Sequence, residues 1–196
     1  STIGGTPDFS GQYFTRGLDE FAVWDTALTP AQISLLSTGS ARADSITPPA
    51  ASDGDWSTGT NKKIGTYGIG EFDGNTDYVS ASWDSQIDFG GTDSFSWSIW
   101  LKASALPTYS GIISKESTPI GNGWYLYLHL DEVIFAAFSD TFGDYLQINT
   151  PSAIVAGSNW YHIVATYGGT NDASGMKIYI DGNLKIPAAS VDLGSL

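Results

Sequence analysis

The 196-residue sequence has no cysteine, only eight Lys and Arg residues and only two histidines. The lack of cysteine excludes disulfides, thiolate metal sites and cysteine nucleophiles. The eight basic residues face 21 Asp and Glu, which gives a formal net charge of −13. Surfaces that bind nucleic acid or anionic membranes need clustered Lys and Arg. The composition therefore excludes nucleic acid as an expected partner.

Long hydrophobic runs are also missing. The longest, such as residues 134–138, fall far short of the roughly 20 apolar residues that span a bilayer, so we expect no membrane insertion. No signal peptide is visible and the sequence starts with Ser1 rather than Met, so we interpret it as a fragment or a processed chain. With 41% hydrophobic and 15% charged residues, the chain has ample material for a folded core.

Short alternating segments separated by Gly, Asn, Asp and Ser are abundant, and they predict antiparallel strands. Residues 95–102 place Phe95, Trp97, Ile99 and Leu101 on one face, with Ser96, Ser98 and Lys102 on the opposite face. Residues 124–130 alternate in the same way. The triplet Asp181-Gly182-Asn183 predicts a hairpin in which Gly and Asn take positive φ and residues 184–186 pair back. Further strands are predicted at residues 18–25, 133–138, 145–148, 160–167 and 176–180.

One helix is predicted after residue 29. Thr29 is a suitable N-cap, Pro30 suits the first helical position, Gln32 can complete a capping box and Gly39 can end the helix. Residues 40–66 are small, polar and rich in Pro and Gly, which predicts a linker or long surface loop. The apolar face of the helix is predicted to consist of Ile33, Leu35 and Leu36.

Four segments in order, residues 72–79, 95–102, 159–167 and 177–182, resemble the successive strands of laminin G-like domains of the concanavalin A-like jelly roll. The resemblance implies an all-β fold, an antiparallel two-sheet jelly-roll sandwich. Residues 14–29 are similar to the closing strand and terminal helix of that family, yet here they come first.

This inverted order has two interpretations. The chain is circularly permuted, or it was cut from a tandem array and its head belongs to a preceding repeat. An absent strand would expose sheet edges and core, so we expect closure within one domain of residues 1–196. In that domain residues 1–39 supply the closing strand and helix, residues 40–66 the linker and residues 67–196 the main body. We also expect residues 18–24 to pair with the strand that follows Phe72.

Nothing in the sequence indicates catalysis. The β-glucanases of this fold need two carboxylates on one strand face, usually as Glu-x-Asp-x-x-Glu, and that motif is absent. The adjacent acids at 19–20 and 131–132 would point to opposite sheet faces if they lie in strands. His129 and His162 are too few for a histidine metal cluster, and each is typical of a strand face or a satisfied core. We therefore expect no enzyme.

Calcium is the cofactor that the sequence favours. Asp73, Asn75 and Asp77 form an oxygen-rich loop of the kind that binds hard cations. The resemblance to calcium-binding members of the fold implies that Asp19 lies beside this loop. The alternative is that Asp73-Gly74-Asn75 is a turn whose side chains accept backbone amides.

Glycan binding would need aromatic rings on a sheet face or rim beside polar groups. Tyr125, Tyr127 and His129 form such a stripe, with Tyr109, Trp83 and Tyr145 expected on loops. The alternative is that these rings pack under loops.

These observations predict a non-catalytic recognition or adhesion module that binds a glycan or an extracellular protein surface. We expect an extracellular, cell-surface or virion-surface location. A homo-oligomer or strand exchange with neighbouring repeats would fit the same segment order. Two other functions stay open: a structural repeat of a surface adhesin or virion appendage, and a glycan hydrolase.

Overall fold

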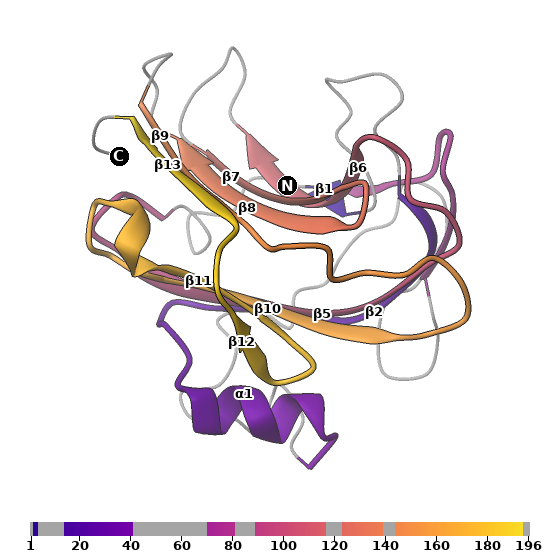
Figure 1. Ribbon diagram of the computed structural model, residues 1–196, viewed down its shortest axis with the longest axis horizontal. Helices are drawn as coiled ribbons and strands as arrows, with labels where there is room; N and C mark the ends of the chain where they lie inside the picture. Colours follow the sequence, from indigo (N-terminus) through magenta and orange to yellow (C-terminus); the bar gives the residue numbers. More distant parts are fainter. Residues whose placement is uncertain are drawn as a thin grey trace.

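The computed structural model describes residues 2–3, 14–40, 70–80, 89–116, 123–138 and 144–193. Their strands form two antiparallel sheets that pack face to face (Figure 1), which confirms the predicted sandwich. The upper sheet in Figure 1 has the order β13 (Ala189–Leu193), β9 (Tyr145–Asn149), β8 (Glu132–Phe138), β7 (Gly123–His129), β6 (Ser110–Glu116), β1 (Thr2–Ile3) and β4 (Val79–Ser80). The lower sheet has the order β12 (Asn183–Lys185), β11 (Met176–Ile180), β10 (Tyr161–Gly168), β5 (Ser94–Ala103), β2 (Thr15–Trp24) and β3 (Gly70–Asp73).

The main core lies between the sheets and is built from the alternating apolar faces that the sequence predicts. Trp97 of β5 packs against Trp124 of β7 with ring centroids 4.3 Å apart, and Phe135 of β8 meets Trp97 edge-on at 4.7 Å. Phe95 stacks on Trp97 at 5.5 Å. Aromatic pairs of this kind stabilise beyond the area they bury, so these rings fix how the two sheets sit on each other.

The first strands of the chain complete both sheets. β1 pairs with β4 and β6 in the upper sheet, and β2 lies between β3 and β5 in the lower sheet. Among the described residues, β2 pairs with β3 from Thr15 opposite Asp73 to Leu18 opposite Gly70, and on its other edge with β5 from Arg16 opposite Ala103 to Trp24 opposite Ser96. Of residues 18–24, which were predicted to pair with the strand that follows Phe72, Leu18 lies opposite β3; the chain before Gly70 lies outside the described residues, so the rest of that pairing stays a prediction. Whether permutation or excision from an array produced this segment order stays a prediction.

β2 contains a bulge that reorients its second half. The register with β5 shifts between Asp19 and Ala22, and Glu20 takes a φ of 47°. The Asp19 carboxylate accepts a hydrogen bond from the Glu20 amide at 2.8 Å, which satisfies a backbone donor that the bulge removes from the ladder. Beyond the bulge Val23 faces the main core, whereas Trp24 is buried on the opposite face of the sheet.

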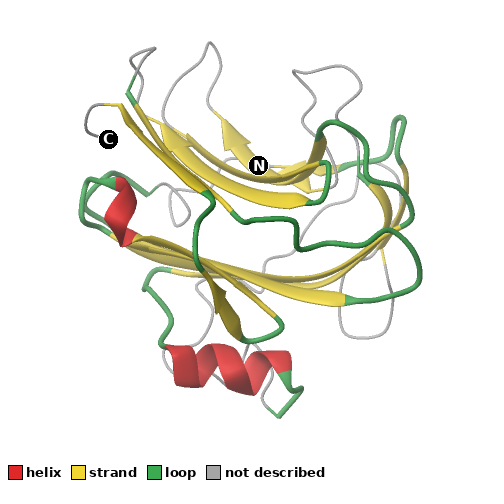
Figure 2. Cartoon of the chain, in the orientation of Figure 1, coloured by secondary structure: helices red, strands yellow, loops and turns green. Residues whose placement is uncertain are grey.

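Helix α1 (Pro30–Ser37) covers part of the outward face of the lower sheet (Figure 2). The predicted capping box is present, with the Thr29 hydroxyl accepting from the Gln32 amide and the Gln32 side chain accepting from the Thr29 amide. The prediction for Leu35 was wrong, because its side chain is 45% exposed. Only two of the three predicted apolar side chains therefore face the sheet. The second core that α1 encloses, here the helix cluster, consists of Ala22, Trp24, Leu28, Ile33, Leu36, Val164 and Tyr179.

The β11–β12 hairpin touches this helix. Positive φ falls on Asp181 (52°) and Gly182 (75°), not on Gly and Asn as predicted, because the two-residue turn ends before Asn183. The returning strand is accordingly Asn183–Lys185 rather than residues 184–186. A Cβ on Gly182 would lie 2.6 Å from the Ser37 hydroxyl, so the turn and the C-terminal end of α1 are in close contact.

Most of the predicted linker, residues 41–66, lies outside the described residues. Within the described ranges, no helix has both the length and the apolar character needed to cross a membrane.

Candidate functional site

The outward face of the upper sheet carries the predicted aromatic stripe. On β7 the side chains of Trp124, Leu126 and Leu128 are buried in the core, so the alternate residues point outward. These are Tyr125, Tyr127 and His129, each partly exposed. Figure 1 shows the upper sheet curved, with its outward face on the hollow side. The stripe therefore lines a concave surface.

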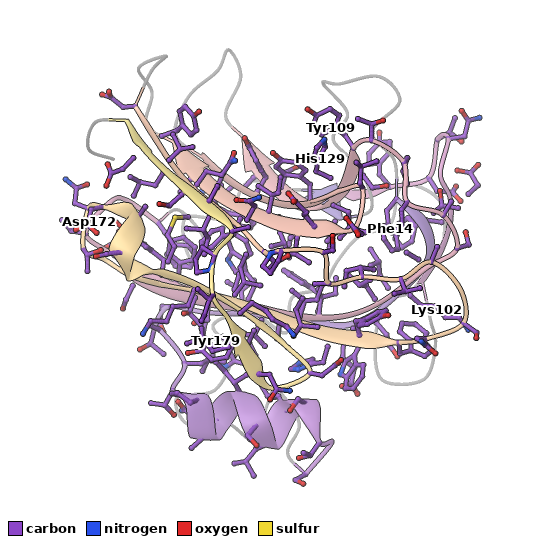
Figure 3. All side chains as sticks on the ribbon, in the orientation of Figure 1. Phe14, Lys102, Tyr109, His129, Asp172 and Tyr179 are labelled. Carbon is purple, nitrogen blue, oxygen red and sulfur yellow. The ribbon has the colours of Figure 1, made fainter. Side chains whose placement is uncertain are left out.

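Tyr109 extends the stripe from the segment that precedes β6. Its ring is 44% exposed and lies 4.9 Å from the ring of His129 and 6.0 Å from that of Tyr127, centroid to centroid. Figure 3 shows Tyr109 and His129 together on the upper side of the molecule. The Leu130 amide donates to the Pro107 carbonyl at 3.2 Å, which ties the Tyr109 segment to the β7–β8 turn.

Tyr127 is the centre of the group. Burial raises the pKa of its hydroxyl, and the nearby hydroxyls of Tyr125, Tyr109 and Tyr145 raise it further. Tyr145 begins strand β9, which confirms the strand predicted at residues 145–148 and contradicts the expectation of Tyr145 on a loop. Trp83, the remaining aromatic of the prediction, lies outside the described residues. The surface made by Tyr109, Tyr125, Tyr127, His129 and Tyr145 is called the tyrosine face below.

Polar side chains border the tyrosine face on β8 and β9. Leu146 and Ile148 are buried, so Gln147 and Asn149 share the outward face with the tyrosines. The Asn149 amide nitrogen donates to a carboxylate oxygen of Glu132 at 2.8 Å. Sequence reasoning missed these three residues. Alternation along residues 145–149 signals Gln147 and Asn149, but only the strand register brings Glu132 beside them.

This arrangement suits recognition of a hydroxyl-rich ligand. Partly exposed aromatic rings offer flat apolar faces, the adjacent amides both donate and accept hydrogen bonds, and the carboxylate accepts them. Rings held by strands lose little freedom on binding, because the sheet already fixes their backbone.

A family model described as the concanavalin A-like lectin/glucanases superfamily, of the laminin G type, matches residues 73–192. The chain belongs to this superfamily. Among curated proteins, none matches the sequence. Laminin G-like domains are typically non-catalytic binding modules. The matched range holds the whole tyrosine face, while β2 and α1, which complete the lower sheet and the helix cluster, lie outside it.

Asp19 does not lie beside the loop of Asp73, Asn75 and Asp77, the other residues expected to bind calcium in this laminin G-like domain. Thr15, not Asp19, lies opposite Asp73, and Asp19 is four positions further along β2, about 13 Å away at ~3.3 Å per residue. Among the described residues no group of three or more His, Asp or Glu side chains could hold a metal ion. A site that joins Asp19 to Asp73 and Asp77 therefore does not fit this geometry.

The Asp73 carboxylate has a structural role instead. One of its oxygens accepts the amides of Asn75 at 2.8 Å, Thr76 at 2.9 Å and Asp77 at 3.2 Å. These backbone donors lower the pKa of Asp73 to about 2. An Asp77 oxygen in turn accepts from the Asp73 amide at 3.1 Å. The loop has the hydrogen bonding of the turn that was the alternative to a metal site.

A Ser–His pair lies on the lower sheet of the domain, but it is out of contact with solvent. Ser98 Oγ lies 2.7 Å from His162 Nε2, and the two residues are only 3% and 1% exposed. Burial lowers the pKa of His162 to about 4. The described part of the chain offers no hydrogen-bond partner to His162 Nδ1. With no acid to orient the imidazole and no access for a substrate, the pair lacks the geometry of a nucleophile and its base.

Proposed function

We propose that this domain is a carbohydrate-recognition module that binds through the tyrosine face and performs no catalysis. The observation that carries the proposal is the contact of Tyr109 with both Tyr127 and His129 at 6.0 and 4.9 Å on a concave sheet face. The three rings form a continuous, partly exposed aromatic surface. Sugar rings stack on such surfaces through their apolar C–H faces, while neighbouring polar groups bond their hydroxyls.

The test compares two exposed tyrosines in a glycan array followed by calorimetry on the strongest ligand. Tyr109→Ala is expected to weaken binding at least about fivefold, since stacking aromatics contribute on the order of 1 kcal/mol. Tyr78→Ala is the matched control, because Tyr78 is 38% exposed and directly precedes β4, the edge strand of the upper sheet that β6 and β1 separate from β7. Equal losses in the two variants, or no glycan bound by the parent protein, would contradict the proposal.

The same assays separate the other functions that the sequence left open. Turnover of a β-glucan would identify a hydrolase. If neither the monomer nor a multimerised form binds or hydrolyses a glycan, a structural repeat would be favoured. Calcium in the loop of Asp73, Asn75 and Asp77 stays a prediction, and binding and melting curves in calcium and in chelator test it.

The setting of the proposed function is outside the cell. Laminin G-like domains are typically extracellular, and a cell-surface or virion-surface position would present the tyrosine face to glycans or to an extracellular protein surface. A shallow face binds weakly by itself. Repetition along a chain or in a homo-oligomer, including one formed by strand exchange, would raise effective concentration without new contacts.

A further inference from the structure

A fixed carboxylate stands at one end of the tyrosine face. Glu132 begins β8 directly opposite His129, the last residue of β7. Opposite residues of antiparallel strands have Cβ atoms about 5 Å apart, so Glu132 adjoins the end of the aromatic stripe. Its carboxylate is oriented by the Asn149 amide at 2.8 Å. This hydrogen bond uses one oxygen and leaves further acceptor positions for a ligand.

Among the described residues, no Lys or Arg side chain shares this face with Glu132. The described Lys and Arg residues are Arg16, Lys102, Lys115, Lys177 and Lys185. All except Lys115 belong to strands of the lower sheet, where Figure 3 shows Lys102 far from Tyr109 and His129. Lys115 is paired with Trp124, whose side chain faces the core, and is only 2% exposed.

Resting on the saccharide-binding function proposed above, we propose that the tyrosine face prefers saccharides that carry a free amine, such as glucosamine oligomers. An ammonium group is attracted to the faces of tyrosine rings and forms a charge-assisted hydrogen bond with a carboxylate. The face supplies both, with Tyr109 and Tyr127 beside His129 and Glu132 directly across from it.

The same arrangement selects against acidic saccharides. A uronate or sulfate placed on the tyrosine face would meet Glu132, and no described Lys or Arg lies there to pair with it. The net charge of −13 adds long-range repulsion. The expected order of affinity is amine-bearing, then neutral, then acidic.

Calorimetry with three hexasaccharides of equal length tests this order, using glucosamine, N-acetylglucosamine and galacturonate at low salt and at a pH that protonates the amine. The glucosamine hexamer is expected to bind about fivefold tighter than its N-acetyl counterpart, the range of a partly exposed ion pair with a cation–π contact. The galacturonate hexamer is expected to bind weakest. Equal binding of the amine and N-acetyl forms would overturn the preference while leaving carbohydrate recognition intact. Binding of no hexamer, together with a blank glycan array, would instead overturn the proposed function itself.

Two charge-matched variants locate the preference. Glu132→Gln keeps a hydrogen-bond acceptor for the Asn149 amide and is expected to weaken binding of the glucosamine hexamer about fivefold more than binding of the N-acetyl hexamer, so that the difference between the two disappears. Asp25→Asn removes the same charge from an exposed bend after β2 and is expected to keep the difference. An unaltered preference in Glu132→Gln, or an equal loss in Asp25→Asn, would show that the site does not set it. Melting curves of each variant confirm that the fold is retained.

Discussion

The outward faces of the two sheets follow the same alternating pattern but end in different environments. On the upper sheet, Tyr127 and His129 stay partly exposed on a concave surface. On the lower sheet, Ser98, His162 and Tyr179 are buried, and Tyr179 belongs to the helix cluster under α1. Outward-pointing polar and aromatic residues therefore lie on a partly exposed face in the upper sheet and in a second interior in the lower sheet. The two outward faces differ in what covers them, because α1 packs over part of the lower sheet.

Among single substitutions, we expect the largest loss of stability in the helix cluster between α1 and the lower sheet. Trp24 is fully buried in the helix cluster, so Trp24→Ala should lower the free energy of unfolding by about 3–5 kcal/mol. Urea denaturation measures the change. Leu35→Ala, on the solvent side of the same helix, should change stability by less than about 0.5 kcal/mol. Similar losses in both variants would mean that α1 is not docked as described.

The two histidines provide the next contrast. Folded His162 has a pKa of about 4 because burial disfavours its charged form, against about 6.5 in an unfolded chain. The stability it contributes is complete above pH 6.5 and is lost as the pH falls from 6.5 to about 4, since the unfolded state takes the proton first. The loss should reach about 3 kcal/mol.

Denaturation curves across this pH range for the parent and His162→Gln measure the effect. The variant retains an amide that can bond Ser98 but cannot titrate, so the difference between the two proteins should shrink as the pH falls. His129→Gln, on the open face, serves as the control. A parent profile that parallels that of His162→Gln would show that His162 is accessible to protons in the folded state.

The turn beneath α1 should give a smaller effect. Gly182→Ala puts a Cβ at a φ of 75° and 2.6 Å from the Ser37 hydroxyl, which should destabilise the domain by about 1 kcal/mol. Ser37→Ala added to the Gly182→Ala variant should recover only the part of the lost stability that the contact with the Ser37 hydroxyl causes. Full recovery would indicate that the backbone conformation itself carries no penalty.

The smallest stability effect is expected on the tyrosine face. Tyr109→Ala removes a ring that is 44% exposed, so the free energy of unfolding should change by less than about 0.5 kcal/mol, while glycan binding falls. Denaturation and calorimetry on the same sample check both statements. A large loss of stability would indicate that Tyr109 packs to hold the fold rather than to bind.

Local pattern was sufficient to predict most of the strands, the capped helix and the outward position of Tyr125, Tyr127 and His129, but β1, β6 and β13 were not predicted. The features that were predicted depend on residues within one turn or one strand, where periodicity and capping act. Contacts between different strands were harder to predict. The sequence does not state that Thr15, rather than Asp19, lies opposite Asp73 in the register of β2 and β3.

The candidate site shows the same division. Glu132 joins Asn149 through the register of β8 and β9, and register depends on turn length and on burial over the whole sheet. The burial of His162 likewise depends on what packs over its strand. The alternation of residues along one strand predicts neither the register between β8 and β9 nor the burial of His162.

The position of β2 has a consequence for how the domain folds. Its contacts with β5 join residues far apart in the sequence, with Trp24 opposite Ser96. Just after β2, the Leu28 amide donates to the hydroxyl of the same Ser96, 68 residues away. Loops of this length must close before such contacts can stabilise the sheet, which slows folding. During synthesis β2 leaves the ribosome long before β5 is made. Until then its apolar side chains, among them Val23 and Trp24, lack the strand against which they pack in the folded domain. The segment that completes the lower sheet is thus the one most open to capture by a chaperone or by a neighbouring chain.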